Sequence, residues 1–164
     1  MKRIALVLSM GLSLFAMGRG PARAELADAE HRVDSAIQKK WNDDPLVLIG
    51  GTRAFYIEGF GVVMTTELNL VTGPSVNPFN PVLSPEARER YRKRKLERFP
   101  QLKDLMSSTV QQAKTWFPTL KDDEQITLGV QLYRYTWEDP GTIPSQMVWT
   151  TTKRANSPVK LQDN

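Results

Sequence analysis

Residues 54–71, with the sequence AFYIEGFGVVMTTELNLV, decide the fold class. From Val62 onward, apolar and polar side chains alternate along this stretch, which is typical of a strand that buries one face. Gly59 and Gly61 interrupt the run, and we interpret them as a bulge in one long bent strand rather than as a tight turn. The stretch predicts β structure in the first half of the chain.

Further β structure is expected on both sides of this stretch. Leu46–Ile49 is a short apolar run that ends at two glycines, and the stretch QITLGVQLYRYTW (residues 125–137) alternates apolar with polar side chains. Residues 147–152 follow a turn signal at Asp139–Gly141 and are expected to form the returning strand. From Ala155 onward the chain is polar and is expected to fray.

Two helices are predicted from apolar residues spaced three and four apart. The first covers residues 26–41, and the second begins at Ser84-Pro85, a helix-start signal, and continues to Phe117. As one straight helix this second segment would measure about 50 Å, whereas a compact domain of this size is roughly 35–40 Å across. A kink or restart is therefore expected near Pro100. The segment before this helix, residues 73–85, is rich in proline and is expected to form a loop.

Strands that come in adjacent pairs, instead of alternating singly with helices, favour an α+β fold. The prediction is an antiparallel sheet of four to five strands with two main helices on one face, the second kinked near Pro100. A single domain is expected over residues 25–154, followed by a polar tail over residues 155–164.

The first 24 residues, MKRIALVLSMGLSLFAMGRGPARA, resemble a cleaved signal peptide. Two basic residues precede an apolar run, Ile4–Met17, that is too short to span a bilayer, and Ala22-Arg23-Ala24 fits a cleavage site. The mature chain is expected to begin at Glu25, to have no transmembrane segment, and to be periplasmic or extracellular. It would carry equal numbers of basic and acidic residues, so the net charge of +4 belongs to the precursor alone.

The composition excludes several kinds of chemistry. The chain has no cysteine and one histidine, His31, which is expected on the polar side of the first helix. No nucleophile elbow or phosphate-binding glycine loop occurs, so we assign no catalytic residue, metal or cofactor. Paired carboxylates are the remaining catalytic apparatus, with Glu58, Glu67 and Glu138 as the candidates for a small hydrolase of envelope polymers.

A basic run is the feature with the most contrast. Seven basic residues lie between Arg88 and Arg98, with only two glutamates among them. One interpretation is an exposed helix supported by ion pairs four residues apart. The other is a binding surface for an acidic protein or an anionic envelope component, with nucleic acid disfavoured outside the cytoplasm. The residues assigned to that surface are Arg90, Arg92, Lys93 and Arg94.

Aromatic side chains near the last strands supply a second, weaker indication. The residues are Tyr133, Tyr135, Trp137 and Trp149. An exposed aromatic sheet face can bind a sugar or a peptide, but the same face can instead be covered by the helices.

Three hypotheses follow. The leading one is a small, exported, non-enzymatic module that binds a partner in the cell envelope, with the first contact at the Arg88–Arg98 segment. The second is the carboxylate hydrolase, and the third is a structural subunit that pairs strand edges in a homo-oligomer. The sequence predicts neither the identity of the partner nor the oligomeric state.

Overall fold

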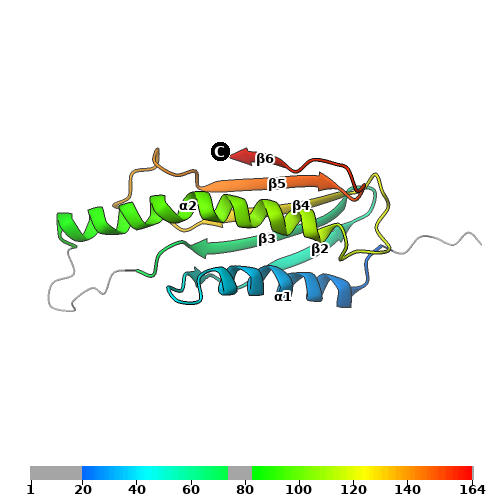
Figure 1. The fold of residues 1–164 in the computed structure, drawn as a ribbon, viewed down its shortest axis with the longest axis horizontal. Coiled ribbons are helices and arrows are strands. Elements are labelled where there is room, and N and C mark those ends of the chain that lie inside the picture. The colour runs from blue at the N-terminus through cyan, green and yellow to red at the C-terminus, as the bar shows by residue number, and fades with distance from the viewer. Residues whose placement is uncertain (1–19, 74–82, 164) are drawn as a thin grey trace, which may run out of the picture.

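The computed structural model describes residues 20–73 and 83–163 of the chain; residues 1–19 of the predicted signal peptide and residues 74–82 of the proline-rich loop lie outside that description. Among the described residues, two helices cover one face of a six-stranded sheet, which confirms the α+β class (Figure 1). The elements follow one another as α1 (Arg23–Lys40), β1 (Val47–Leu48), β2 (Arg53–Ile57), β3 (Gly61–Asn69), α2 (Pro85–Ala113), β4 (Gln125–Leu132), β5 (Gln146–Thr152) and β6 (Lys160–Asp163).

The sheet is mixed, with the strand order β1-β3-β4-β5-β6 and with β2 also pairing with β3. Strands β3 and β4 run parallel, from the Gly61–Gln125 pair to the Leu68–Leu132 pair, and the other pairs are antiparallel. The parallel pair arises because α2 connects β3 to β4 and carries the chain back along the sheet. The expected antiparallel sheet of four to five strands is corrected on both counts. The sixth strand, β6, lies in the segment expected to fray.

The stretch that decides the fold class forms a hairpin and not one bent strand. The chain reverses over residues 58–60, so that Phe55 pairs with Val63 and Ile57 with Gly61. Gly59 and Gly61 have φ angles of +77° and +129°, and a Cβ at Gly61 would lie 2.0 Å from the carbonyl oxygen of Gln125. The tight turn was the correct alternative, and the bulge prediction is wrong.

The core lies between the helices and the inward face of the sheet. All five apolar residues predicted to form the stripe of α1 are buried, namely Leu26, Ala29, Val33, Ile37 and Trp41. Trp149 of β5 is 1% exposed and belongs to this core, so it does not contribute to an exposed aromatic face. Burial of these side chains is the main favourable term in folding, at about 25 cal/mol for each Å² of apolar surface.

Helix α2 runs as one element through Pro100, so of the two expected alternatives, a kink or a restart, the restart does not occur. The Oγ atom of Ser84 accepts a hydrogen bond from the Ala87 N–H at 3.2 Å, and Pro85 occupies the first turn, as predicted. At 1.5 Å per residue the helix is about 43 Å long. It fits because the molecule is elongated, and because the first turns of α2 extend beyond the ends of the strands (Figure 1).

Helix α1 covers the outer edge of the sheet at the start of β2. The Asp34 carboxylate accepts hydrogen bonds from the N–H and the hydroxyl of Thr52 at 3.0 and 2.6 Å. The Glu30 carboxylate accepts a 2.9 Å bond from the N–H of Ala54, and this bond is the main reason that the pKa of Glu30 is lowered. Two helix carboxylates thus occupy positions that a neighbouring strand would otherwise use.

The sheet face opposite the helices is almost uncharged along its three central strands. Its outward side chains include Val63, Thr65, Thr127, Val148 and Thr150, which are exposed or half-buried. The same face also carries Glu67 and three glutamines, as suits a sheet that has one face in water.

Candidate functional site

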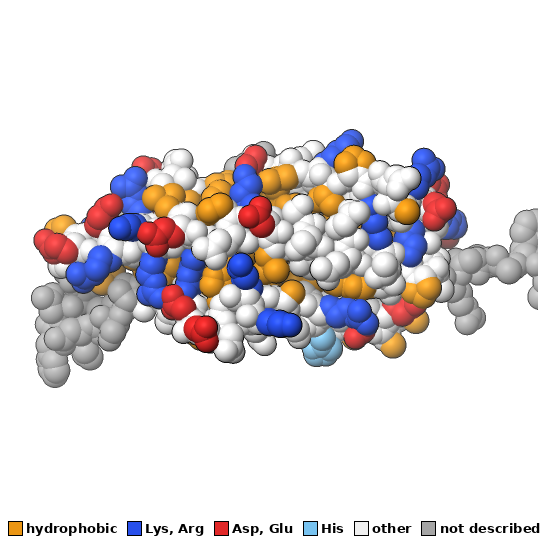
Figure 2. Space-filling view, viewed as in Figure 1, with side chains coloured by type: hydrophobic (Ala, Val, Ile, Leu, Met, Phe, Trp, Pro, Cys, Tyr) orange, Lys and Arg blue, Asp and Glu red, His pale blue; other side chains and the backbone are white. Residues whose placement is uncertain are grey.

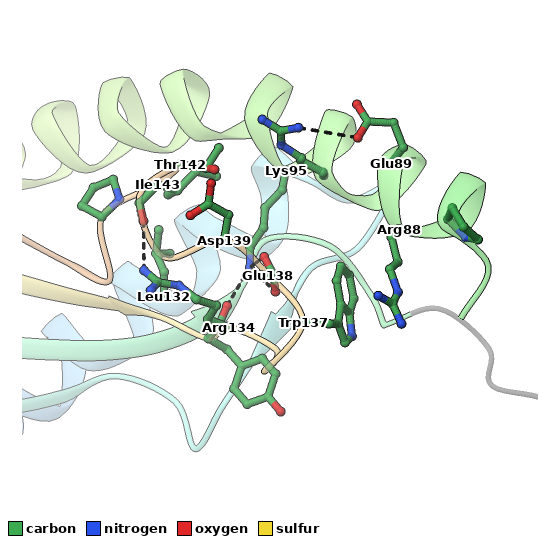
Figure 3. Close-up of a pocket in the computed structure, with 14 residues that line it drawn as sticks. Arg88, Glu89, Lys95, Leu132, Arg134, Trp137, Glu138, Asp139, Thr142 and Ile143 are labelled. Carbon is green, nitrogen blue, oxygen red and sulfur yellow. Dashed lines mark hydrogen bonds and ion pairs between the residues drawn. The ribbon is translucent and has the colours of Figure 1, made fainter. Parts of the chain in front are cut away.

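A cavity of about 350 Å³ lies where the first turns of α2 extend over the connection between β4 and β5 (Figure 3). Three sides are formed by the N-terminal half of α2, the end of β4 and residues 133–144 of that connection. The lining residues are Pro85, Arg88, Glu89, Arg92, Lys95, Leu132, Tyr133, Arg134, Trp137, Glu138, Asp139, Thr142, Ile143 and Pro144. We call this cavity the α2 pocket. Its size falls within the usual range for small-molecule sites, about 300–1,000 Å³.

Lys95 forms the floor of the α2 pocket. Its Nζ atom donates to the carbonyl oxygen of Tyr133 at 2.7 Å and to the two carboxylate oxygens of Glu138 at 3.0 and 2.7 Å. The exposed fractions of the two side chains are 4% for Lys95 and 13% for Glu138. Burial lowers the pKa of Lys95, while the hydrogen bond and charge of Glu138 oppose that shift. The pair fastens the β4–β5 connection to α2.

Arg98 is also buried, and it fastens a different loop. Its guanidinium donates to the carbonyl oxygens of Leu70 at 2.6 Å and Asp44 at 2.7 Å. The Asp44 carboxylate forms ion pairs with both Arg98 and Arg94. The hydrogen bond from Arg94, followed by that from Arg98, holds the pKa of Asp44 below its ordinary value. Arg94 therefore serves the same loop contact as Arg98.

The remaining members of the basic run lie on the surface. Arg88 and Arg92 are exposed and line the α2 pocket, whereas Arg90 and Lys93 are exposed and lie outside it. Charged side chains of both signs gather at the end of the molecule where the N-terminal half of α2 lies (Figure 2). Of the four residues predicted to bind, the structure places only Arg92 in the pocket.

The aromatic residues of the β4–β5 connection pack against α2. Tyr91 of α2 lies edge-on to Tyr135 and to Trp137, with ring centroids 5.6 and 5.3 Å apart. Tyr135 stacks on Trp137 at 5.4 Å, and the guanidinium carbon of Arg88 lies 5.8 Å from the Trp137 ring centroid. Tyr135 and Trp137 are therefore half-buried against the helix. Tyr133 is exposed and, with Trp137, contributes to the pocket wall.

The three candidate carboxylates are not brought together. Glu58 is exposed in the β2–β3 turn, and Glu67 lies opposite Gln131 toward the other end of β3. At about 3.3 Å per residue, the length of β3 from Gly61 to Glu67 separates them by roughly 20 Å. Glu138 is in the α2 pocket, bound to Lys95. No two of them face each other across a cavity in the described residues.

His31 is exposed on α1, as expected. Within the described residues, no group of histidine, aspartate and glutamate side chains is arranged to hold a metal ion. No helix in the same part of the chain is both long and apolar enough to cross a membrane.

Arg88, Lys95 and Arg134 were not predicted as individual site residues, although Arg88 and Lys95 lie in the basic run. The spacing held a signal for Lys95. Extending the buried positions of α2 backward from Leu102 by steps of four and three reaches Arg98, Lys95 and Tyr91, all of which are buried. Apolar spacing alone does not reveal this continuation, because two of its three side chains are cationic.

Comparisons with protein-family models, with curated proteins and with solved structures find no match to this chain.

Proposed function

We propose that this protein is an exported, non-enzymatic module that binds an anionic partner in the cell envelope through the α2 pocket. The observation that carries the proposal is the meeting of two sequence features, the basic run and the aromatic connection, in one cavity. Arg88 and Arg92 are at its rim, and both are exposed, so their guanidinium groups are accessible to an anionic group.

The two alternative functions have less support. The hydrolase would need two carboxylates about 5–10 Å apart across a cleft, and Glu58, Glu67 and Glu138 lie in separate places. The strand-pairing subunit would need a free edge, whereas α1 carboxylates occupy the backbone N–H groups of Thr52 and Ala54. The opposite edge, β6, is exposed but only four residues long, and it carries Lys160 and Asp163 at its ends, features that discourage pairing with another strand.

Proximity crosslinking of the protein in its own cells, followed by mass spectrometry, tests the proposal. One variant combines Arg88→Glu with Arg92→Glu, and the matched control combines Arg90→Glu with Lys93→Glu. Both make the same change in net charge within the same turns of α2, but only the first pair lines the pocket. Arg94 is left unchanged because its reversal would place a glutamate beside Asp44.

We expect one dominant partner, lost in the pocket variant and retained in the control, with melting temperatures within a few degrees of the parent. Equal loss in both variants would instead indicate a diffuse electrostatic surface. Full retention in both would overturn the proposal and return weight to the hydrolase.

A further inference from the structure

The α2 pocket has two chemically different ends. Arg88 and Trp137 lie on one side of the Lys95–Glu138 pair, and Thr142 and Ile143 lie on the other (Figure 3). A ligand that occupies the whole cavity must therefore pass over a neutralised ion pair. It must also present different chemistry at each end.

Arg88 supplies the cationic end. No described carboxylate lies within 4 Å of its guanidinium, whereas Arg92 has Glu89 at 3.6 Å and Lys95 has Glu138 at 2.7 Å. Its guanidinium lies over the Trp137 ring, which leaves its N–H donors available to an anion. A planar guanidinium binds a carboxylate through two parallel hydrogen bonds.

The other end holds the aliphatic side chains of the pocket, with the polar side chains of Asp139 and Thr142 beside them. Leu132 ends strand β4 and is buried, and Ile143 and Pro144 are half-buried on the far side of the cavity. Arg134 lies at this end as well, but one of its guanidinium nitrogens donates to the carbonyl oxygen of Ile143 at 3.0 Å, which ties it to the pocket wall. An aliphatic chain or a small ring would bury apolar surface here.

Charge and volume limit the ligand further. The lining has four basic and three acidic side chains, a net charge of +1. Among the described lining residues, Arg88 and Arg134 are the basic side chains without a carboxylate partner. Because Glu89 and Asp139 are in the same lining, a monoanion suits it better than a dianionic phosphate. With about 30 Å³ for each water-sized group, the cavity holds roughly a dozen non-hydrogen atoms.

We infer that the α2 pocket takes a free monocarboxylic acid that has an apolar body and about ten carbon atoms in all. The carboxylate binds Arg88, and the apolar body lies against Leu132, Ile143 and Pro144. A peptide is disfavoured, because peptide recognition in an extended form uses main-chain hydrogen bonds from a free strand edge, and side chains of a helix and a loop dominate this cavity. The inference rests on the proposed function and names its ligand class.

Calorimetric titration with decanoate tests this inference. The protein is expressed from the full chain and purified in the form that the cells produce. Decanoate has about a dozen non-hydrogen atoms, and decanol is the matched neutral probe. We expect saturable one-to-one binding of decanoate, and at least tenfold weaker binding of decanol. Arg88→Ala should weaken decanoate binding at least tenfold, which corresponds to about 1.4 kcal/mol. Arg90→Ala, exposed and outside the pocket, should stay within twofold of the parent.

A second variant tests the apolar end. Ile143→Asp should abolish decanoate binding while the far-UV circular dichroism spectrum stays that of the parent. Equal affinity for decanoate and decanol, or equal effects of Arg88→Ala and Arg90→Ala, would overturn the inference. Tighter binding of the dipeptide leucyl-leucine than of decanoate would also overturn the inference, and would indicate that the pocket binds the carboxyl terminus of a peptide.

The two proposals can fail separately. If decanoate does not bind but capture of a cellular partner still depends on Arg88 and Arg92, the ligand class is wrong and the proposed function stands. If decanoate binds as expected but no partner depends on those residues, the pocket is a small-molecule site and the envelope-partner proposal fails.

Discussion

The two halves of α2 follow the same spacing with different chemistry. The N-terminal half buries Tyr91, Lys95 and Arg98, whereas the C-terminal half buries Leu102, Met106 and the apolar residues that follow at the same spacing. The C-terminal half packs on the inward face of the sheet, where the facing side chains are apolar. The N-terminal half extends past the strands and meets loop backbone, whose carbonyl groups have no strand partner and need donors.

This difference shows that a buried helix stripe takes its chemistry from what lies beneath it. Apolar side chains suit a sheet face, and long cationic side chains suit loop carbonyls because they carry several donors on an apolar stem. The same cationic side chains raise the net charge of the segment, so a structural role and a binding role are superimposed in one run of sequence.

The largest expected effect is in the apolar half. Leu102→Ala removes a fully buried side chain and should lower the free energy of unfolding by about 3 kcal/mol, through lost burial and the cavity that remains. Leu96→Ala is the matched control, because Leu96 lies in the same helix but is 39% exposed. Urea denaturation measures both. A loss at Leu96 as large as that at Leu102 would contradict the assignment of the buried face.

A smaller loss is expected in the polar half. Lys95→Met leaves the largely buried carboxylate of Glu138 without its cation and should cost about 2 kcal/mol, less than for a fully buried pair because Glu138 keeps some contact with water. Glu138→Gln should cost a similar amount. The double variant should cost clearly less than the sum of the two, as urea denaturation of all four proteins can show. Strictly additive losses would mean that the two side chains are not coupled.

The pH dependence separates Lys95 from the apolar positions. Burial lowers its pKa in the folded chain below the ordinary value of 10.5. Between the lowered pKa of the folded chain and the ordinary pKa of the unfolded chain, the unfolded chain binds more protons. The contribution of Lys95 to the free energy of unfolding therefore rises with pH. The difference in stability between the parent and Lys95→Met should therefore grow from pH 8 to pH 10.

Burial raises the pKa of Tyr91 in the folded chain. At higher pH the folded chain therefore keeps a proton that the unfolded chain loses, and this effect lowers the free energy of unfolding as the pH rises. Since both proteins contain Tyr91, its effect is largely removed from their difference. Lys93→Met removes an exposed lysine from the same helix and serves as the control. A constant difference between the parent and Lys95→Met across this pH range would show that Lys95 is not desolvated.

The smallest expected effects are on the outer face of the same turns. Arg94→Ala breaks a half-exposed ion pair with Asp44 and should cost about 0.5 kcal/mol, a loss that high salt reduces. Arg90→Ala should stay within about 0.5 kcal/mol of the parent because the side chain is exposed. Thermal unfolding at low and high salt distinguishes them. A salt-independent loss at Arg94 would mean that its role is packing and not ion pairing.

Local patterns predicted the elements well where side-chain spacing alone determines burial. The stripe of α1 and the helix start at Ser84 are confirmed, because both depend on neighbours within one or two turns. The parallel pairing of β3 with β4 and the sixth strand were missed, since each depends on partners far along the chain. The hairpin at Gly59 was weighed and rejected because glycine in a strand permits a bulge and a turn equally.

The α2 pocket was predictable only in part. The basic run and the aromatic connection were both noted, but about 40 residues separate Lys95 from Glu138, and no local rule joins them. Their contact depends on α2 extending past the strands. Helix α2 extends past the strands because it is much longer than β4 and β5. The expected kink or restart at Pro100 implied shorter straight segments, so this extension was not predicted.

The first turn of α1 includes residues on both sides of the predicted cleavage point after Ala24. Pro21 is buried, Gly20 lies against the Tyr56 ring, and the Glu25 carboxylate accepts a 2.7 Å hydrogen bond from the N–H of Ala22. A peptidase that cuts after Ala24 would have to open this turn once it has formed, so cleavage and folding compete for the same few residues. Cleavage would then have to take place before the domain folds. The released helix would begin with a new positive amino group at the end of its dipole that disfavours cations.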